Sequence, residues 1–214
     1  MPHPIEEQSY QILGKRLDFA SLDDDSAEII ARVVHSTADL DFARSMAITS
    51  NFVISSLKLL QDHRPIVADV SMTKFGISSK ESISAITEQF DLLESRTRSY
   101  SSMFKAVSNF SPAIFVVGCS PTSLEALLDR SELLEGSVVI GMPVGFVGAA
   151  ESKLRLRNSD LEFVTNSGER GGSAAAAAAM NALIRISNGQ RYVKDGRIVG
   201  PYQTANGVSN ELGN

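Results

Sequence analysis

Two glycine-rich stretches each follow an apolar run and precede a helical pattern, where proteins often hold an anion. GMPVGFVGAAESK spans Gly141 to Lys153, and NSGERGGS covers residues 166–173. Free backbone N–H groups at the start of a helix, together with the helix dipole, favour negative charge. Arg170 in the second stretch can form a two-pronged pair with a carboxylate or a phosphate. The second stretch is therefore a candidate anion site, and the alternative is an ordinary capped helix beside a solvated arginine.

The first stretch does not match the known nucleotide-binding patterns. In a Gly-x-Gly-x-x-Gly fingerprint the middle glycine would fall at Pro143, and no lysine follows a glycine at phosphate-loop spacing. Glu162 lies about 20 residues on, as a ribose-binding acid should, but it begins its strand instead of ending it. A tight turn with glycines for backbone geometry is the simpler interpretation. Pro143 and Phe146 among the glycines would nevertheless suit a flat organic ligand.

Three titratable side chains stand out by their position. His35 ends the helical run AEIIARVVH, where the helix dipole favours the imidazolium and so a general acid, with a structural cap as the alternative. Cys119 stands before a helix, where the pKa of a thiol falls, but without a base partner we expect a small buried residue. Asp69 lies inside an apolar strand and must therefore be paired or hydrogen-bonded. No spacing indicates a metal site or a Ser/His/Asp triad.

The elements that must position these residues follow a strand–loop–helix rhythm. Apolar runs at residues 113–118, 137–141 and 161–165 are each followed by a loop and a helix, after an earlier strand in PIVADVSM. This alternation predicts an α/β fold with a mainly parallel sheet flanked by helices. Such sheets bind ligands beyond the carboxyl ends of their strands. We expect four loops to converge there: residues 71–78, 119–122, 142–148 and 166–173.

The remaining elements are predicted from caps and turns. Residues 1–100 are expected to be mainly helical, with a capping box at Asp25 and Glu28 and further helices over residues 47–61 and 82–109. Ser120 and Pro121 begin the helix that follows the loop at residues 119–122. Near the C-terminus, Asp195-Gly196 predicts a hairpin, and the polar tail at 205–214 should be frayed. We expect one domain over residues 1–190 and a C-terminal hairpin and tail over 191–214.

Composition excludes several classes of protein. The chain has 214 residues and a net charge of −5, which argues against non-specific nucleic-acid binding. No apolar run approaches the ~20 residues of a membrane span, so no membrane partner is expected. The first residues lack the features of a signal peptide, and the single cysteine suits a reducing compartment. These features predict a cytoplasmic protein.

Seven motifs, in order along the chain, carry a resemblance to a known family. They are HPIEEQSY, VVHSTADLDFA, PIVADVSM, TRSYSSM, VVGCSPTSLEAL, IGMPVGFVGAAESK and SGERGGSAAAAAAMNAL, and they extend to about Leu183. Together they resemble the precorrin-8X methylmutase family of cobalamin biosynthesis, which includes the cobalt-precorrin-8 methylmutases. PVGFVGAAESK followed by GGS before an alanine-rich helix is the most specific part of the match.

The resemblance implies an isomerase with a Rossmann-like subunit, a homodimer and no separate cofactor. Its substrate would be a corrinoid tetrapyrrole that carries several carboxylates, and a methyl group would move from C-11 to C-12 at ring C. His35 matches the family's catalytic histidine, which protonates or hydrogen-bonds the macrocycle. The substrate-binding residues that the resemblance and the loop chemistry suggest are Gln8, Ser9, Arg98, Ser120, Thr122, Pro143, Val144, Gly145, Phe146, Arg170, Gly171, Gly172 and Ser173. No metal ligand is expected.

Two loops depart from the family pattern. Cys119-Ser120-Pro121-Thr122-Ser123 stands where the family usually has Asn-Ala-Pro-Thr-Ala, and Glu169-Arg170 stands where it usually has Arg-Lys. The first change removes an amide, and the second weakens the local positive potential. A corrinoid-binding protein without turnover is therefore the main alternative to the enzyme, and retention of His35 speaks against it. A nucleotide-dependent α/β enzyme is a third hypothesis, which predicts stabilisation by a dinucleotide and which Pro143 speaks against.

Overall fold

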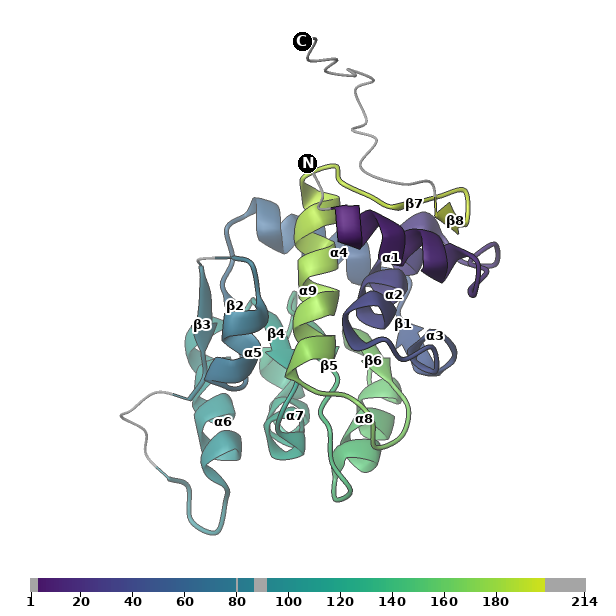
Figure 1. The fold of residues 1–214 in the computed structure, drawn as a ribbon. Helices are drawn as coiled ribbons and strands as arrows, with labels where there is room; N and C mark the ends of the chain where they lie inside the picture. The colour runs from purple at the N-terminus through teal and green to yellow at the C-terminus, as the bar shows by residue number, and fades with distance from the viewer. Residues whose placement is uncertain (1–3, 80, 87–91, 199–214) are drawn as a thin grey trace.

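The computed structural model describes residues 4–79, 81–86 and 92–198. Within these ranges the centre is a six-stranded sheet in the order β1-β6-β5-β4-β2-β3, parallel except for β1 at one edge (Figure 1). The strands are β1 (Met46–Ile48), β2 (Ile66–Ala68), β3 (Ser82–Ser84), β4 (Ile114–Val117), β5 (Val138–Gly141) and β6 (Glu162–Asn166). The predicted α/β class with a mainly parallel sheet is confirmed.

Helices cover both faces of this sheet. They are α1 (Pro4–Gly14), α2 (Asp24–Thr37), α3 (Phe42–Ser45), α4 (Phe52–Gln61), α5 (Ser71–Gly76), α6 (Arg98–Phe110), α7 (Pro121–Leu128), α8 (Ala149–Arg157) and α9 (Ser173–Ser187). One apolar core lies between the sheet and α6, α7 and α8, and the other lies under α4 and α9. Helices α1 and α2 form an outer layer on α9 (Figure 1). None of the described helices is long and apolar enough to cross a membrane.

The sequence explains the two cores. Because successive strand residues point to opposite faces, Ile114 and Val116 of β4 enter one core while Phe115 and Val117 enter the other. Helix α9 lies against the sheet with its alanines, of which Ala175, Ala176, Ala177, Ala178 and Ala179 are buried. Small side chains allow the close approach of helix to sheet, as the sequence suggested.

Four local predictions were wrong. Helix α2 is capped by Asp23, whose side chain accepts from the N–H of Ser26, and not by the Asp25–Glu28 box. Residues 46–48 form the edge strand β1 and not the start of a helix. Residues 82–84 form the edge strand β3, whereas the helix expected from residue 82 begins at Arg98. Residues 71–76 form the short helix α5 where a loop was expected.

The predicted hairpin is present as β7 (Val193–Lys194) and β8 (Arg197–Ile198), which pair antiparallel. Asp195 and Gly196 both have positive φ, at 51° and 70°, as this type of two-residue turn requires. The hairpin packs against α1 and α2. The tail predicted to be frayed, residues 205–214, lies outside the described residues.

Candidate active site

Asp69 joins two loops at the carboxyl end of the parallel strands. Its Oδ2 accepts from the backbone N–H groups of Cys119 (2.7 Å) and Ser120 (2.9 Å), just after β4. Its Oδ1 accepts from the N–H of Val70 (2.9 Å) and from the hydroxyl of Thr73 (2.7 Å). The residue is fully buried. The prediction of a buried, hydrogen-bonded carboxylate is confirmed, and the carboxylate fixes the loops after β2 and β4.

The start of α9 belongs to the same assembly. The hydroxyls of Thr73 and Ser173 lie 2.9 Å apart, which links the α5 segment to the first turn of α9. Gly118, at the end of β4, passes so close that a Cβ there would lie 2.7 Å from the Cα of Ser173. The first N–H groups of a helix have no carbonyl partner within the helix, so this end of α9 presents donors at the carboxyl edge.

The two glycine-rich loops are joined backbone to backbone. The N–H of Gly172 donates to the carbonyl of Met142 (2.9 Å), and the N–H of Gly145 donates to the carbonyl of Glu169 (3.1 Å). A Cβ on Gly171 would lie only 2.2 Å from the carbonyl oxygen of Met142. Only glycine fits this crossing, so Gly171 shapes the site through its backbone.

Lys153 binds the backbone of the second glycine-rich loop. Its side chain is fully buried, and Nζ donates to the backbone carbonyl of Arg170. Nδ2 of Asn166 donates to the same carbonyl (2.8 Å), and Nζ also lies 3.4 Å from Oδ1 of Asn166. Burial lowers the pKa of Lys153 to about 8. Sequence reasoning did not single out Lys153 or Asn166, although a lysine in the glycine-rich motif was a signal.

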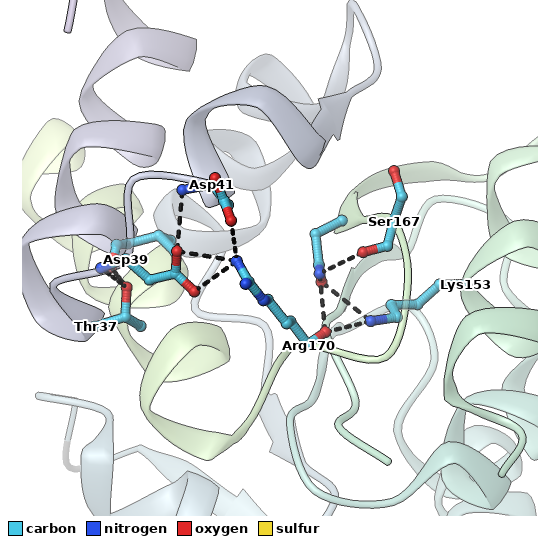
Figure 2. A network of polar contacts seen from close by, with 8 residues as sticks. Thr37, Asp39, Asp41, Lys153, Ser167 and Arg170 are labelled. Atoms are coloured by element: carbon cyan, nitrogen blue, oxygen red, sulfur yellow. Dashed lines mark hydrogen bonds and ion pairs between the residues drawn. The ribbon is translucent and has the colours of Figure 1, made fainter. Parts of the chain in front are cut away.

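Arg170 extends from this loop to the segment after α2 (Figure 2). Its Nη1 lies 3.1 Å from both carboxylate oxygens of Asp39 and 2.5 Å from Oδ2 of Asp41. Figure 2 shows the guanidinium between the two aspartates, on the far side of the loop from Lys153. The Arg170 side chain is 57% exposed. A substrate carboxylate would therefore have to compete with Asp39 and Asp41.

The loop after β4, residues 119–122, presents hydroxyls beside the start of α6. Thr122 lies 2.7 Å from the Thr97 hydroxyl and 2.9 Å from the Ser120 hydroxyl. Thr97 caps α6, whose first residue is Arg98. The structure thus brings Ser120, Thr122 and Arg98 to one place. Cys119 is exposed, contrary to the buried residue we expected. Partial desolvation of its thiol and the charge of Asp69 nevertheless raise the pKa of Cys119.

The first glycine-rich loop exposes apolar side chains. Pro143 is buried, whereas Val144 is 45% exposed, Phe146 90% and Val147 87%. Burial of large apolar side chains is favourable, so a loop that leaves Phe146 in water offers a surface to a flat apolar partner. Val147 was not among the predicted residues. A cavity of about 590 Å³ between the amino ends of β5 and β6, lined by Ser137 and Glu162, lies at the opposite end of the strands.

His35 lies in the last turns of α2, against α1. Its Nδ1 is 2.7 Å from the hydroxyl of Ser9, and its ring stacks on Tyr10 with centroids 4.9 Å apart. Ser9 thus contacts His35, and Gln8 is exposed on α1 beside it. The loop that follows α2 carries Asp39 and Asp41, so it connects this histidine layer to Arg170.

The charges around His35 oppose its protonation. Burial lowers the pKa of His35, and the neighbouring Arg32 lowers it further, whereas Glu6 acts in the opposite direction. The helix dipole favours the imidazolium, but burial and Arg32 act against it. Glu6 accepts from Arg32 (2.5 Å) and Arg185 (2.7 Å). Burial alone would raise the pKa of Glu6, but the two arginines together outweigh it and lower that pKa.

The arrangement offers hydrogen-bond donors to an anion at the carboxyl edge of the sheet. The imidazole of His35 can in addition donate a proton or a hydrogen bond. Within the described residues no group of three His, Cys, Asp or Glu side chains could hold a metal ion. Glu162 begins its strand and accepts from Thr49 and Asn51, far from a ribose position. The ring of Tyr10 and the aspartates after α2 are site neighbours that the sequence did not reveal, because their role depends on tertiary contacts.

Comparisons with known proteins place the chain in a family. The family model described as precorrin-8X methylmutase matches residues 4–186. A cobalt-precorrin-8 methylmutase from Methanothermobacter thermautotrophicus is 36% identical over 196 residues, which cover 86% of this chain and 93% of that protein. A precorrin-8X methylmutase from a Sinorhizobium species is 30% identical and covers 85% and 93% of the two chains.

A solved structure agrees with these matches. The precorrin-8X methylmutase of Thermus thermophilus superposes with a TM-score of 0.75 at 27% identity, over 87% of this chain and 98% of that one. The similarity therefore covers the sheet, both helical layers and the loops of the candidate site.

Proposed function

Because the chain belongs to the precorrin-8X methylmutase family, we propose that it moves a methyl group from C-11 to C-12 of a corrin ring. The substrate is precorrin-8X, giving hydrogenobyrinic acid, or cobalt-precorrin-8, giving cobyrinic acid. The observation that carries this proposal is the match of residues 4–186, which includes a histidine held by Ser9 at the end of α2. The enzyme is on this proposal an isomerase of cobalamin biosynthesis.

The reaction needs no second substrate. The bond between the methyl carbon and C-11 breaks and a bond from the same carbon to C-12 forms, so the product is an isomer and no oxidant or reductant is consumed. A rigid site and a hydrogen-bond donor near ring C are sufficient in kind for such a step.

His35 supplies that donor. Because its pKa is lowered, the neutral imidazole dominates at neutral pH. If the Ser9 hydroxyl donates to Nδ1, the remaining ring proton sits on Nε2 and is available to the macrocycle. In that arrangement Ser9 holds the imidazole with its Nε2 proton free, and Gln8 lies beside Ser9 on α1 as a further polar residue.

The carboxyl edge of the sheet receives the rest of the substrate. Arg98 and Arg170, the hydroxyls of Ser120, Thr122 and Ser173, and the first turn of α9 provide donors for acetate and propionate carboxylates. Gly171 and Gly172 contribute through the path of their backbone, since the N–H of Gly172 already donates to Met142. Val144, Gly145 and Phe146 provide an apolar surface for the plane of the ring, and the buried Pro143 fixes the loop that carries them. The bonds that Asp69, Lys153 and the crossing glycine loops make between these segments support this assignment, because a large ligand needs its contacts at fixed positions.

We also propose that the chain acts as a homodimer in the cytoplasm. The exposed Met72, Phe75, Phe146 and Val147 support a partner at the carboxyl edge, since large apolar surfaces are costly in water. Light scattering on the purified protein tests the stoichiometry.

The test compares the wild type with His35→Ala and with the control His63→Ala, at an exposed position beyond α4. Each is titrated with hydrogenobyrinic acid by absorption spectroscopy and then incubated with precorrin-8X and with cobalt-precorrin-8. We expect all three to bind the product, while His35→Ala alone loses roughly 10²- to 10⁴-fold in conversion rate. Binding without conversion by the wild type would favour the corrinoid-binding protein, and no binding would overturn the proposal.

A further inference from the structure

The C-terminal hairpin lies beyond the family match, which ends at residue 186, yet it is tied to α2. Oε2 of Glu28 accepts from the backbone N–H groups of Tyr192 (2.7 Å) and Val193 (2.9 Å). Nε of Arg191 donates to Asp25 (2.7 Å), and the N–H of Gly196 donates to Asp24 (3.1 Å). Three acidic side chains in the first turns of α2 thus fix the path of the hairpin.

This path places the ring of Tyr192 behind Tyr10, which in turn stacks on the candidate catalytic residue His35. The rings of Tyr192 and Tyr10 stack with centroids 3.9 Å apart and an interplanar angle of 8°. Tyr10 in turn stacks on His35 at 4.9 Å and 20°. Tyr10 and Tyr192 are both fully buried. We call His35, Tyr10 and Tyr192 the ring stack.

The ring stack is surrounded by charges that are themselves held in place. Arg32 of α2 and Arg185 of α9 both contact Glu6 of α1. The Arg185 guanidinium lies 5.8 Å from the centroid of the Tyr192 ring. Glu28 completes the set from α2, beside the hairpin. Helices α1, α2 and α9 thus each contribute a charged side chain that acts on His35: Glu6, Arg32 and Arg185.

We propose that Tyr192 is a positioning residue for His35, acting through Tyr10. The flat face of Tyr192 restrains Tyr10, and Tyr10 restrains the imidazole so that it keeps its hydrogen bond to Ser9 and its orientation toward the substrate. The two tyrosine rings also keep water from the rear of the imidazole. The catalytic part of this inference rests on the proposed function, whereas the effect on the imidazole does not.

The alternative is that Tyr192 only fills the core. Loss of the side chain would then lower stability without changing the titration of His35 or the catalytic constants of the folded protein. Ile198 of the same hairpin provides the matched control, because it packs on the apolar core outside the ring stack. Ile198→Ala loosens the hairpin without removing a ring.

The experiment uses the full-length protein and the variants Tyr192→Phe, Tyr192→Leu and Ile198→Ala. The pKa of the His35 imidazole is measured by NMR titration, with His63 as an internal reference. Circular dichroism shows which variants are folded, and kcat and KM are measured with the methylmutase substrate. Tyr192→Leu retains apolar volume, so it folds more readily than an alanine variant.

We expect Tyr192→Phe and Ile198→Ala to keep the wild-type titration midpoint and kcat. Tyr192→Leu should move the midpoint up toward the ordinary value of about 6.5, because water reaches the imidazole. Its kcat should fall roughly tenfold with little change in KM, as expected when a reacting group is misplaced. An unchanged midpoint in folded Tyr192→Leu would overturn the proposal. If the wild type shows no turnover but Tyr192→Leu still shifts the His35 midpoint, the positioning role of Tyr192 is supported and the proposed function fails.

Discussion

The carboxyl edge of the sheet and the outer helical layer each bury a carboxylate, and they treat it differently. Asp69 at the edge accepts four hydrogen bonds from two loops, the one after β2 and the one after β4. Glu28 in the outer layer uses Oε2 for two backbone N–H groups, and its Oε1 has no hydrogen-bond partner in the described part of the chain. Burial raises the pKa of Glu28, and the hydrogen bonds from Tyr192 and Val193 offset this only in part.

This difference separates two ways of building a site. At the edge, backbone groups converge because parallel strands end together, so one carboxylate can bind two loops at once. In the outer layer, each polar contact between α1, α2, α9 and the hairpin named above needs a side chain of at least one partner, and Oε1 of Glu28 is left without a hydrogen bond in the described part of the chain. The edge is therefore the rigid half of the proposed site, and the layer around His35 is the half whose charges depend on pH.

The largest effect is expected from Asp69→Asn. The amide turns two donors toward N–H and O–H groups that need an acceptor, so we expect about 4 kcal/mol less stability in urea unfolding. Asp62→Asn, at an exposed carboxylate after α4, serves as the control and should change little. A loss below about 1 kcal/mol would show that other contacts hold the loops, and the contrast between the two regions would fail.

A smaller effect is expected from pH at Lys153. Its folded pKa of about 8 lies below the ordinary value of 10.5, so the unfolded chain binds the proton more strongly between these two values. Wild-type stability relative to Lys153→Met should therefore rise by up to about 3 kcal/mol as the pH increases from 8 to 10.5. Paired urea titrations at several pH values measure this difference. A flat difference would mean that the ammonium is well solvated.

The smallest effect is expected from Glu28→Gln. The amide oxygen can still accept from Tyr192 and Val193 and brings no buried charge, so stability at neutral pH should change by only about 1 kcal/mol. The raised pKa of Glu28 means that the native state holds this proton longer than the unfolded state. The wild type should therefore lose stability relative to the variant as the pH rises above about 4.5. A loss as large as that for Asp69→Asn would remove the contrast.

The sequence predicted the edge better than the outer layer, for physical reasons. A carboxylate in an apolar strand had to be buried and bonded, and segments after parallel strands had to meet. Asp69 and three of the four loops therefore followed from local pattern, whereas residues 71–76 form helix α5 in place of the fourth. The three-residue strands β1 and β3 were missed because their identity depends on pairing with β6 and β2. Strands this short carry too few residues to show a period.

The start of α2 shows why the outer layer was harder to predict. Asp23, Asp24 and Asp25 all have the chemistry of a helix cap, so spacing alone could not choose among them. The structure uses Asp23 as the cap, while Asp24 and Asp25 contact the hairpin from the far end of the chain. The lowered pKa of His35 likewise comes from burial and from Arg32 in three dimensions, which the helix position did not reveal.

The crossing of the two glycine-rich loops determines which positions of this region can be substituted during evolution. Their backbones are fixed by Gly171 against Met142, while Phe146 and Val147 project into solvent and support nothing in the fold. Substitutions at the two exposed positions therefore cost little stability, whereas the path of the loop tolerates almost none. Substitutions of Phe146 and Val147 can thus change ligand preference while the loop backbone stays the same. This loop is therefore the natural place to begin selecting for altered specificity.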